Sequence, residues 1–197
     1  DGVTVYRPPF TCTAYGESGN LNSLNYVKMN KIFFNSLKKE IIKKIWLKKY
    51  PEDAKKNFCY NPIDQKIKNS RIKFANNIHD LNTKLSFYLN SADLIITNYL
   101  STSYLQALIV NKPTIIFFNS NSYFLNKKYS KIYNNLIKSK IMHKSPKGAA
   151  EFLNKNYRNI NNWWNSTSTQ KARQEFITTN IKDKTNMYSA LGKILNR

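Results

Sequence analysis

The chain has few of the residues on which metal sites, disulfide frameworks and glycine-rich nucleotide loops depend. Its 197 residues include only five glycines, two cysteines (Cys12 and Cys59) and two histidines (His79 and His143). Thiol and imidazole groups so few and so far apart predict neither a disulfide framework nor a zinc or iron site. The Gly-x-Gly-x-x-Gly, Walker and Asp-x-Asp motifs are also absent. Their absence argues against NAD enzymes, P-loop NTPases and metal-dependent GT-A transferases.

Long apolar runs are missing as well. The mean hydropathy is −0.57 and no run of 18 apolar residues occurs, so we expect no membrane-spanning helix. The first residues do not have the pattern of a secretory signal, and cysteine is scarce, so a reducing cytoplasm is the expected compartment. The length fits one ordinary domain or one half of a two-domain enzyme.

Acidic residues are scarce: 11 stand against 32 basic ones, for a formal net charge of +21 at pH 7. Only five of the basic residues are arginine. Guanidinium groups that can make two parallel hydrogen bonds to a nucleic-acid base or a phosphate are therefore few. We therefore expect no specific nucleic-acid partner. A lysine-rich surface would still favour peripheral contact with the anionic inner surface of a membrane. A non-catalytic basic module that binds anionic lipid or nucleic acid is thus one alternative.

Short apolar runs alternate with helical patterns along the chain. Strands are expected at Val3–Tyr6, Arg71–Phe74, Asp93–Thr97, Thr114–Phe118 and Lys140–His143. The spacing of apolar residues predicts helices at 32–46, 80–89, 102–110, 123–139, 146–153 and 156–197. Ser145 and Pro146 predict a helix start, because serine caps helices and proline fits their first turn.

The alternation predicts an α/β fold with one doubly wound parallel sheet. Strands that are apolar along their whole length, such as 94–97 and 114–118, are typical of parallel sheets covered on both faces. The segment from Asn98 to Pro113 lies between these two strands and is long enough for a right-handed helical crossover.

Two parts are expected along the chain. Residues 1–155 are predicted to form a Rossmann-like domain, and residues 156–197 a helical extension that packs on it. Trp163 and Trp164 lie on this extension. We expect both to pack in the core or between domains rather than to stack on a sugar.

The crossover carries the best candidate for a binding site. An apolar strand ends at Asn98, and Ser101, Thr102 and Ser103 then open the helical pattern. Helix-start N–H groups and hydroxyls at the carboxyl edge of a sheet favour an anion, so these three residues are candidates for phosphate contact. The alternative is that one hydroxyl merely caps its own helix.

The segments Ser91–Asn98, Ser101–Ser103 and Lys112–Phe117, with Asp80–Asn82, resemble the carboxyl-terminal domain of GT-B glycosyltransferases. The resemblance is to bacterial enzymes of surface-polysaccharide synthesis. A similar stretch occurs in the CDP-glycerol glycerophosphotransferases of teichoic acid synthesis. The likeness also reaches Val5–Pro8 and segments near the end of the chain, so it covers most of the sequence.

The resemblance implies a metal-independent enzyme without a cofactor. It would transfer a sugar from a nucleotide-sugar to a glycan or lipid-linked acceptor of the cell surface. This chain would be the donor-binding half of a GT-B fold, and a missing amino-terminal domain would hold the acceptor and the general base. No catalytic residue is therefore assigned. A glycerol- or ribitol-phosphate transferase with a CDP-linked donor is the enzymatic alternative, and a degenerate domain kept for assembly is another.

Four further residues are candidates for the donor site that the resemblance implies. Arg7 ends the first strand at the shared edge, where its guanidinium would offset the diphosphate charge; a surface ion pair is the alternative. Gln106 stands where nucleotide-sugar GT-B enzymes often place a ribose-binding glutamate, although an exposed helix glutamine is the plainer interpretation. Asn98 and Tyr99, at the strand-to-helix turn, are expected to line the same crevice, unless Tyr99 packs as a half-buried aromatic.

Overall fold

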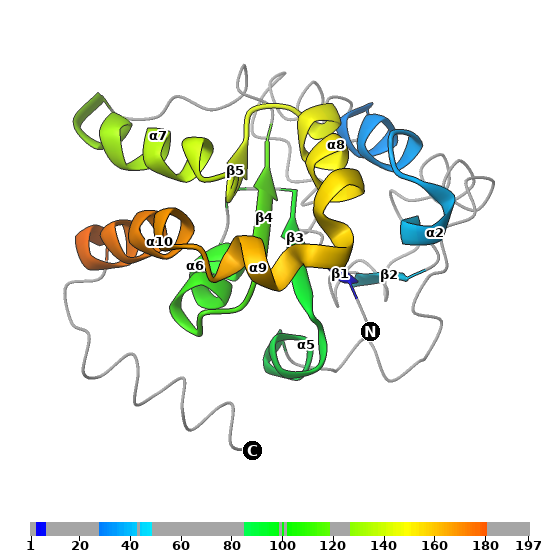
Figure 1. Ribbon diagram of the computed structural model, residues 1–197, viewed down its shortest axis with the longest axis horizontal. Helices are drawn as coiled ribbons and strands as arrows, with labels where there is room; N and C mark the ends of the chain where they lie inside the picture. The colour runs from blue at the N-terminus through cyan, green and yellow to red at the C-terminus, as the bar shows by residue number, and fades with distance from the viewer. Residues whose placement is uncertain are drawn as a thin grey trace, which may run out of the picture.

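Five strands form one sheet in the computed structural model, which describes residues 3–6, 28–42, 44–48, 85–98, 100, 102–118 and 127–180 (Figure 1). The strands are β1 Val3–Tyr6, β2 Ile45–Lys48, β3 Leu94–Thr97, β4 Thr114–Phe117 and β5 Met142–His143. Their order is β2-β1-β3-β4-β5, and every neighbouring pair is parallel. The predicted α/β character with an open parallel sheet is therefore confirmed.

Helices connect and cover these strands. Residues 28–35 are helical, and the further helices are α2 Lys39–Ile42, α5 Leu85–Ser91, α6 Thr102–Ile109, η3 Lys127–Tyr129, α7 Ser130–Lys138, α8 Pro146–Asn156, η4 Tyr157–Asn159, α9 Ile160–Trp164 and α10 Thr167–Asn180. Ser145 caps α8 as predicted, because its hydroxyl accepts a hydrogen bond from the N–H of Gly148 at 3.1 Å. Among the described helices, none is long and apolar enough to cross a bilayer.

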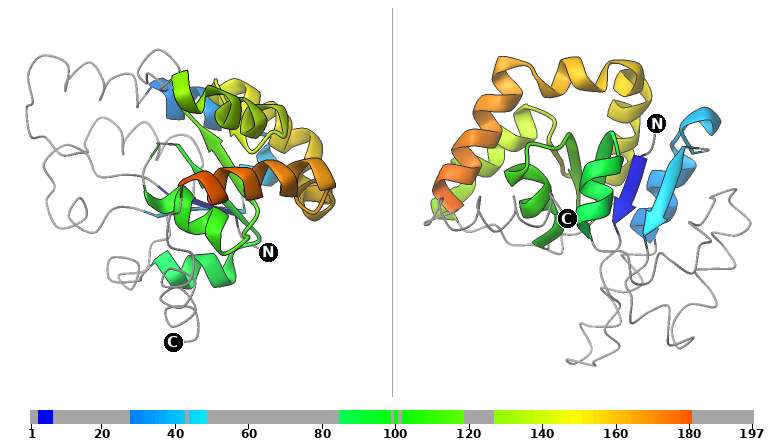
Figure 2. Two further views of the ribbon diagram at one scale, coloured as in Figure 1. Left: turned by 90° about the vertical axis from the view of Figure 1, so that its left-hand side faces the viewer. Right: turned by 90° about the horizontal axis from the view of Figure 1, so that it is seen from below.

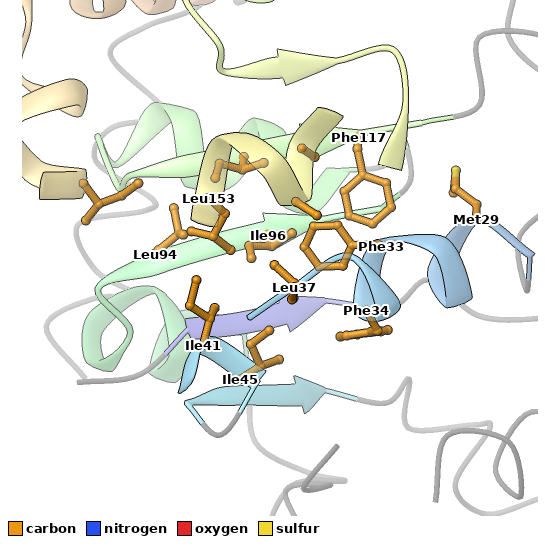
Figure 3. Packing of buried hydrophobic residues seen from close by; sticks show 14 residues of the cluster. Met29, Phe33, Phe34, Leu37, Ile41, Ile45, Leu94, Ile96, Phe117 and Leu153 are labelled. Atoms are coloured by element: carbon orange, nitrogen blue, oxygen red, sulfur yellow. The ribbon is translucent and has the colours of Figure 1, made fainter. Parts of the chain in front are cut away.

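Strands β3 and β4 are buried along their whole length. Because successive side chains of a strand point to opposite faces, Leu94 and Ile96 pack on one face and Ile95 on the other. On the first face, α8 and the helical residues 28–35 cover the sheet, and the ring of Phe33 stacks on Phe117 with centroids 4.5 Å apart (Figure 3). Helices α6, α7 and α10 build the core on the second face (Figure 2).

One predicted element is wrong. The apolar spacing predicts a helix over residues 32–46, whereas the helices end at Ile42 and Ile45–Lys48 forms β2. Strand β2 pairs with β1 at the edge of the sheet, so tertiary pairing overrides a pattern that fits both helix and strand. The strand predicted at Arg71–Phe74 lies outside the described residues.

The carboxyl-terminal helices are fixed to the ends of earlier helices by side-chain donors. Trp163 donates its indole N–H to the carbonyl of Ser139, the C-cap residue just after α7, at 2.8 Å. Trp164 donates to the carbonyl of Asn111, just after α6, at 3.0 Å. Both rings also pack in the core, as predicted for these tryptophans. Aromatic burial and satisfied carbonyls together hold α9 against the elements around the sheet.

Arg173 of α10 makes a third contact of this kind. Its side chain is only 7% exposed, and its Nε and Nη2 donate to the carbonyls of Leu108 and Ile109 at 2.6 and 3.1 Å. These are the last two residues of α6, where carbonyls lack helical partners and the helix dipole favours a positive charge. The guanidinium therefore ties α10 to the carboxyl end of α6.

Candidate functional site

The carboxyl edge of the sheet has a topological switch point between β1 and β3. From β1 the chain proceeds to β2 on one side, whereas β3, β4 and β5 follow one another on the other side. The register pairs Tyr6 with Thr97, so both strands end at the same level. In open α/β sheets, ligands bind in the crevice outside the carboxyl ends of strands at such a point.

Asn98 lies directly at this point, one residue beyond β3. It is 1% exposed, and its Nδ2 donates to Oδ1 of Asn30 at 2.6 Å. Its own Oδ1 is buried and has no hydrogen-bond partner among the described residues, and the same holds for Oγ1 of Thr97. A buried oxygen left unpaired costs about 1–3 kcal/mol, and native proteins leave few of them. The switch point thus holds two buried oxygens with unused hydrogen-bonding capacity.

Asn30 is a site residue that sequence reasoning missed. It is buried in the helical residues 28–35, and its contact with Asn98 bridges 68 positions of the chain. The local sequence Met29–Lys31 has no motif that marks an asparagine for such a role. The apolar spacing predicts a helix only from Ile32 onward, so it does not include Asn30, and the burial of Asn30 becomes visible only when the helical residues 28–35 pack on the sheet.

The structure places the predicted phosphate residues only in part. Helix α6 begins at Thr102, as predicted, but Ser101 and the side chain of Thr102 lie outside the described residues. Ser103 is 3% exposed, so its hydroxyl lies in the interior rather than on an open surface. The first N–H groups of α6 follow the switch point by four residues, which brings the positive end of the helix to the same edge.

The remaining candidates are placed as follows. Gln106 lies in α6, half-buried. Arg7 follows Tyr6, the last residue of β1, but Arg7 and Tyr99 both lie outside the described residues. The structure therefore brings together Asn98 and the start of α6, and it leaves the predicted contacts of Arg7 and Tyr99 as predictions.

His143, at the carboxyl end of β5, is a neutral core residue in this arrangement. It is buried, its Nε2 lies 2.9 Å from the carbonyl of Lys140, and its ring contacts Phe152. Burial lowers the pKa of His143 to about 4, although the Lys140 carbonyl opposes this. Among the described residues no three His, Cys, Asp or Glu side chains gather as metal ligands would.

The comparisons with known proteins identify a family. The sequence matches the model of the LIC12162 family transferase over residues 3–195. Because this match spans nearly the whole chain, the chain belongs to that family of transferases. Searches of the curated proteins and of the solved structures found no match.

Proposed function

Starting from its membership of a transferase family, we propose that the chain binds a nucleotide-sugar donor at the switch point between β1 and β3. The sheet would be the doubly wound, Rossmann-like donor half of a GT-B glycosyltransferase. Its sugar would go to a glycan or lipid-linked acceptor of a cell-surface polysaccharide. The strand order supports this proposal, since β2-β1-β3-β4-β5 is an order of doubly wound nucleotide-binding sheets.

The observation that carries the proposal is the unpaired Oδ1 of Asn98. An amide oxygen can only accept, so it needs a donor such as a ribose or sugar hydroxyl. Oγ1 of Thr97, beside it in sequence, can donate or accept. A hydroxyl group of the ligand would satisfy the amide oxygen of Asn98 at an edge where parallel sheets bind nucleotides.

The diphosphate would lie at the start of α6. Helix-start N–H groups and the helix dipole favour an anion there, and the hydroxyls of Ser101 and Thr102 would add donors. Arg7 would extend from the end of β1 and pair with the same phosphates. Gln106, in the second turn of α6, would contact the ribose.

These groups would stabilise the departing nucleotide diphosphate by fixed positive charge and hydrogen bonds, without a metal. The acceptor and the general base would belong to an amino-terminal domain of the complete enzyme. The described chain would then bind donor nucleotide tightly enough to measure but turn over poorly by itself.

Calorimetric titration with UDP, GDP, CMP and CDP tests the proposal. We expect one of these nucleotides to bind, and Asn98→Ala to weaken that binding by about tenfold or more, as loss of a buried acceptor predicts. Asn154→Ala is the matched control, because Asn154 is also an asparagine with a side-chain hydrogen bond to a distant part of the chain. Its Oδ1 accepts from the N–H of Lys38 and its Nδ2 donates to the carbonyl of Ser36, near the carboxyl end of α8.

Each outcome of the titration has a distinct meaning. Binding of UDP or GDP supports a nucleotide-sugar donor. Binding confined to CMP or CDP would favour a CMP-sugar or a CDP-linked polyol-phosphate donor at the same site. No binding by any of the four nucleotides, or equal weakening by Asn98→Ala and Asn154→Ala, would contradict the proposal.

A further inference from the structure

Residues 127–147 form a stretch with charge of one sign. It contains seven lysines and no acidic residue. All seven are exposed: Lys127, Lys128, Lys131, Lys138, Lys140, Lys144 and Lys147. We call this stretch the basic segment. It runs from η3 through α7 and β5 into the first turn of α8; α7, β5 and α8 lie in the upper half of Figure 1.

Helix α7 separates its lysines from its apolar residues. Lys131 and Lys138 of α7 are seven positions apart, a spacing that places them along one stripe of this helix, and Lys127 and Lys128 precede it in η3. On the opposite side, Leu136 is fully buried, and Ile132 packs against the same core cluster. Core packing therefore holds the lysine stripe outward.

Few acidic residues accompany the basic segment in the described carboxyl-terminal part of the chain, residues 127–180. Within residues 127–180 the only acidic residues are Glu151 and Glu175. Glu151 pairs with Lys147 at 3.9 Å, and both side chains are largely exposed, so this pair is weak. Glu175 accepts a hydrogen bond from Asn135 at 2.7 Å, in a groove of about 550 Å³ between α7 and α10. Lys131 and Lys171 also line this groove and add positive charge on both of its sides.

We propose that the basic segment docks the protein on an anionic lipid surface. Lysine ammonium groups act as compact point charges, and each one near an anionic bilayer strengthens binding by about fivefold. The segment contains no arginine for bidentate contact with phosphate or bases, and its tyrosines, Tyr129 and Tyr133, are partly covered by the protein. Single-stranded nucleic acid would need open aromatic faces for base stacking. The lysine surface therefore fits a membrane better than a nucleic acid, and it does so independently of the proposed donor site.

Vesicle binding by the full chain tests this surface. We expect it to sediment with vesicles of phosphatidylcholine containing 30% phosphatidylglycerol, but not with phosphatidylcholine alone, and to be released as salt rises. The variant K127Q/K128Q/K131Q/K138Q should bind the anionic vesicles at least tenfold more weakly. The matched control, K28Q/K31Q/K38Q/K39Q, removes four exposed lysines from the helical residues 28–35 and the region of α2. It should change binding less than threefold.

Several results would overturn the proposal. One is failure of the unmodified chain to bind anionic vesicles at low salt, and another is equal weakening in the two fourfold variants. A third is that the chain binds an oligonucleotide more tightly than it binds anionic vesicles and that the fourfold basic-segment variant loses this oligonucleotide binding. That result would identify nucleic acid as the partner. The double variants K127Q/K131Q and K144Q/K147Q, each expected to weaken binding several-fold, keep the test intact should a fourfold variant fold poorly.

Discussion

The buried guanidinium of Arg173 predicts a large loss of stability on substitution. Arg173→Met keeps much of the apolar volume of the side chain but removes every donor. Ile109 would then lose its charged partner at 3.1 Å, while Leu108 would keep only the longer bond at 3.2 Å from the N–H of Asn111. The carbonyls at the end of α6 would thus be left partly unsatisfied inside the core.

The expected magnitude follows from these contacts. A hydrogen bond to a charged group contributes about 1.5–3 kcal/mol, and a cation at a helix carboxyl end adds about 0.3–1 kcal/mol. Methionine avoids the cost of burying a guanidinium, which offsets part of the loss. We therefore expect Arg173→Met to lower the free energy of unfolding by about 2–3 kcal/mol.

Urea denaturation followed by tryptophan fluorescence measures this loss, because Trp163 and Trp164 lie on the neighbouring helix α9. Arg173→Lys keeps the charge but loses the planar fork, so it should recover only part of the stability. Lys171→Met, an exposed change on the same helix, is the control and should stay within about 0.5 kcal/mol of the unmodified chain. An Arg173→Met variant as stable as this control would refute the reasoning.

Three further predictions concern single residues. The pKa of His143 is lowered to about 4 in the folded state, so the unfolded state binds the proton more readily, and stability should fall by up to about 3 kcal/mol between pH 6.5 and pH 4. Urea unfolding at several pH values should show this fall reduced in His143→Gln. Trp164→Phe should cost about 1–2 kcal/mol in the same assay at pH 7, because its N–H donates to Asn111. Lys140 has a φ of 64°, so Lys140→Gly should raise the thermal midpoint, with a gain of up to about 1 kcal/mol.

Much of the sheet could be predicted from the sequence. Strands β3 and β4 are apolar except for one threonine each, so burial on both faces could be inferred before any pairing was known. Strand β2 could not be predicted, since Ile45 and Trp46 also fit a helical spacing. Only pairing with β1 decides between the two patterns.

The candidate site, too, could be predicted from the sequence only in part. Asn98 could be chosen because it ends an apolar strand, a position that the local sequence reveals. The hydrogen bond between Asn98 and Asn30 joins residues more than 60 positions apart. The same is true of the hydrogen bonds from Arg173 to the carbonyls at the end of α6. Arginine on an amphipathic helix usually faces solvent, so only the packing of α10 shows that this one is buried.

Backbone NMR of the nitrogen-15-labelled chain measures ligand binding at the switch point between β1 and β3 directly. On addition of the nucleotide that binds in calorimetry, the largest amide shifts should fall at Asn98, at Asn30 and at the start of α6 around Ser103. Shifts confined to the groove between α7 and α10, with the Asn98 and Ser103 amides unmoved, would contradict the proposed donor site.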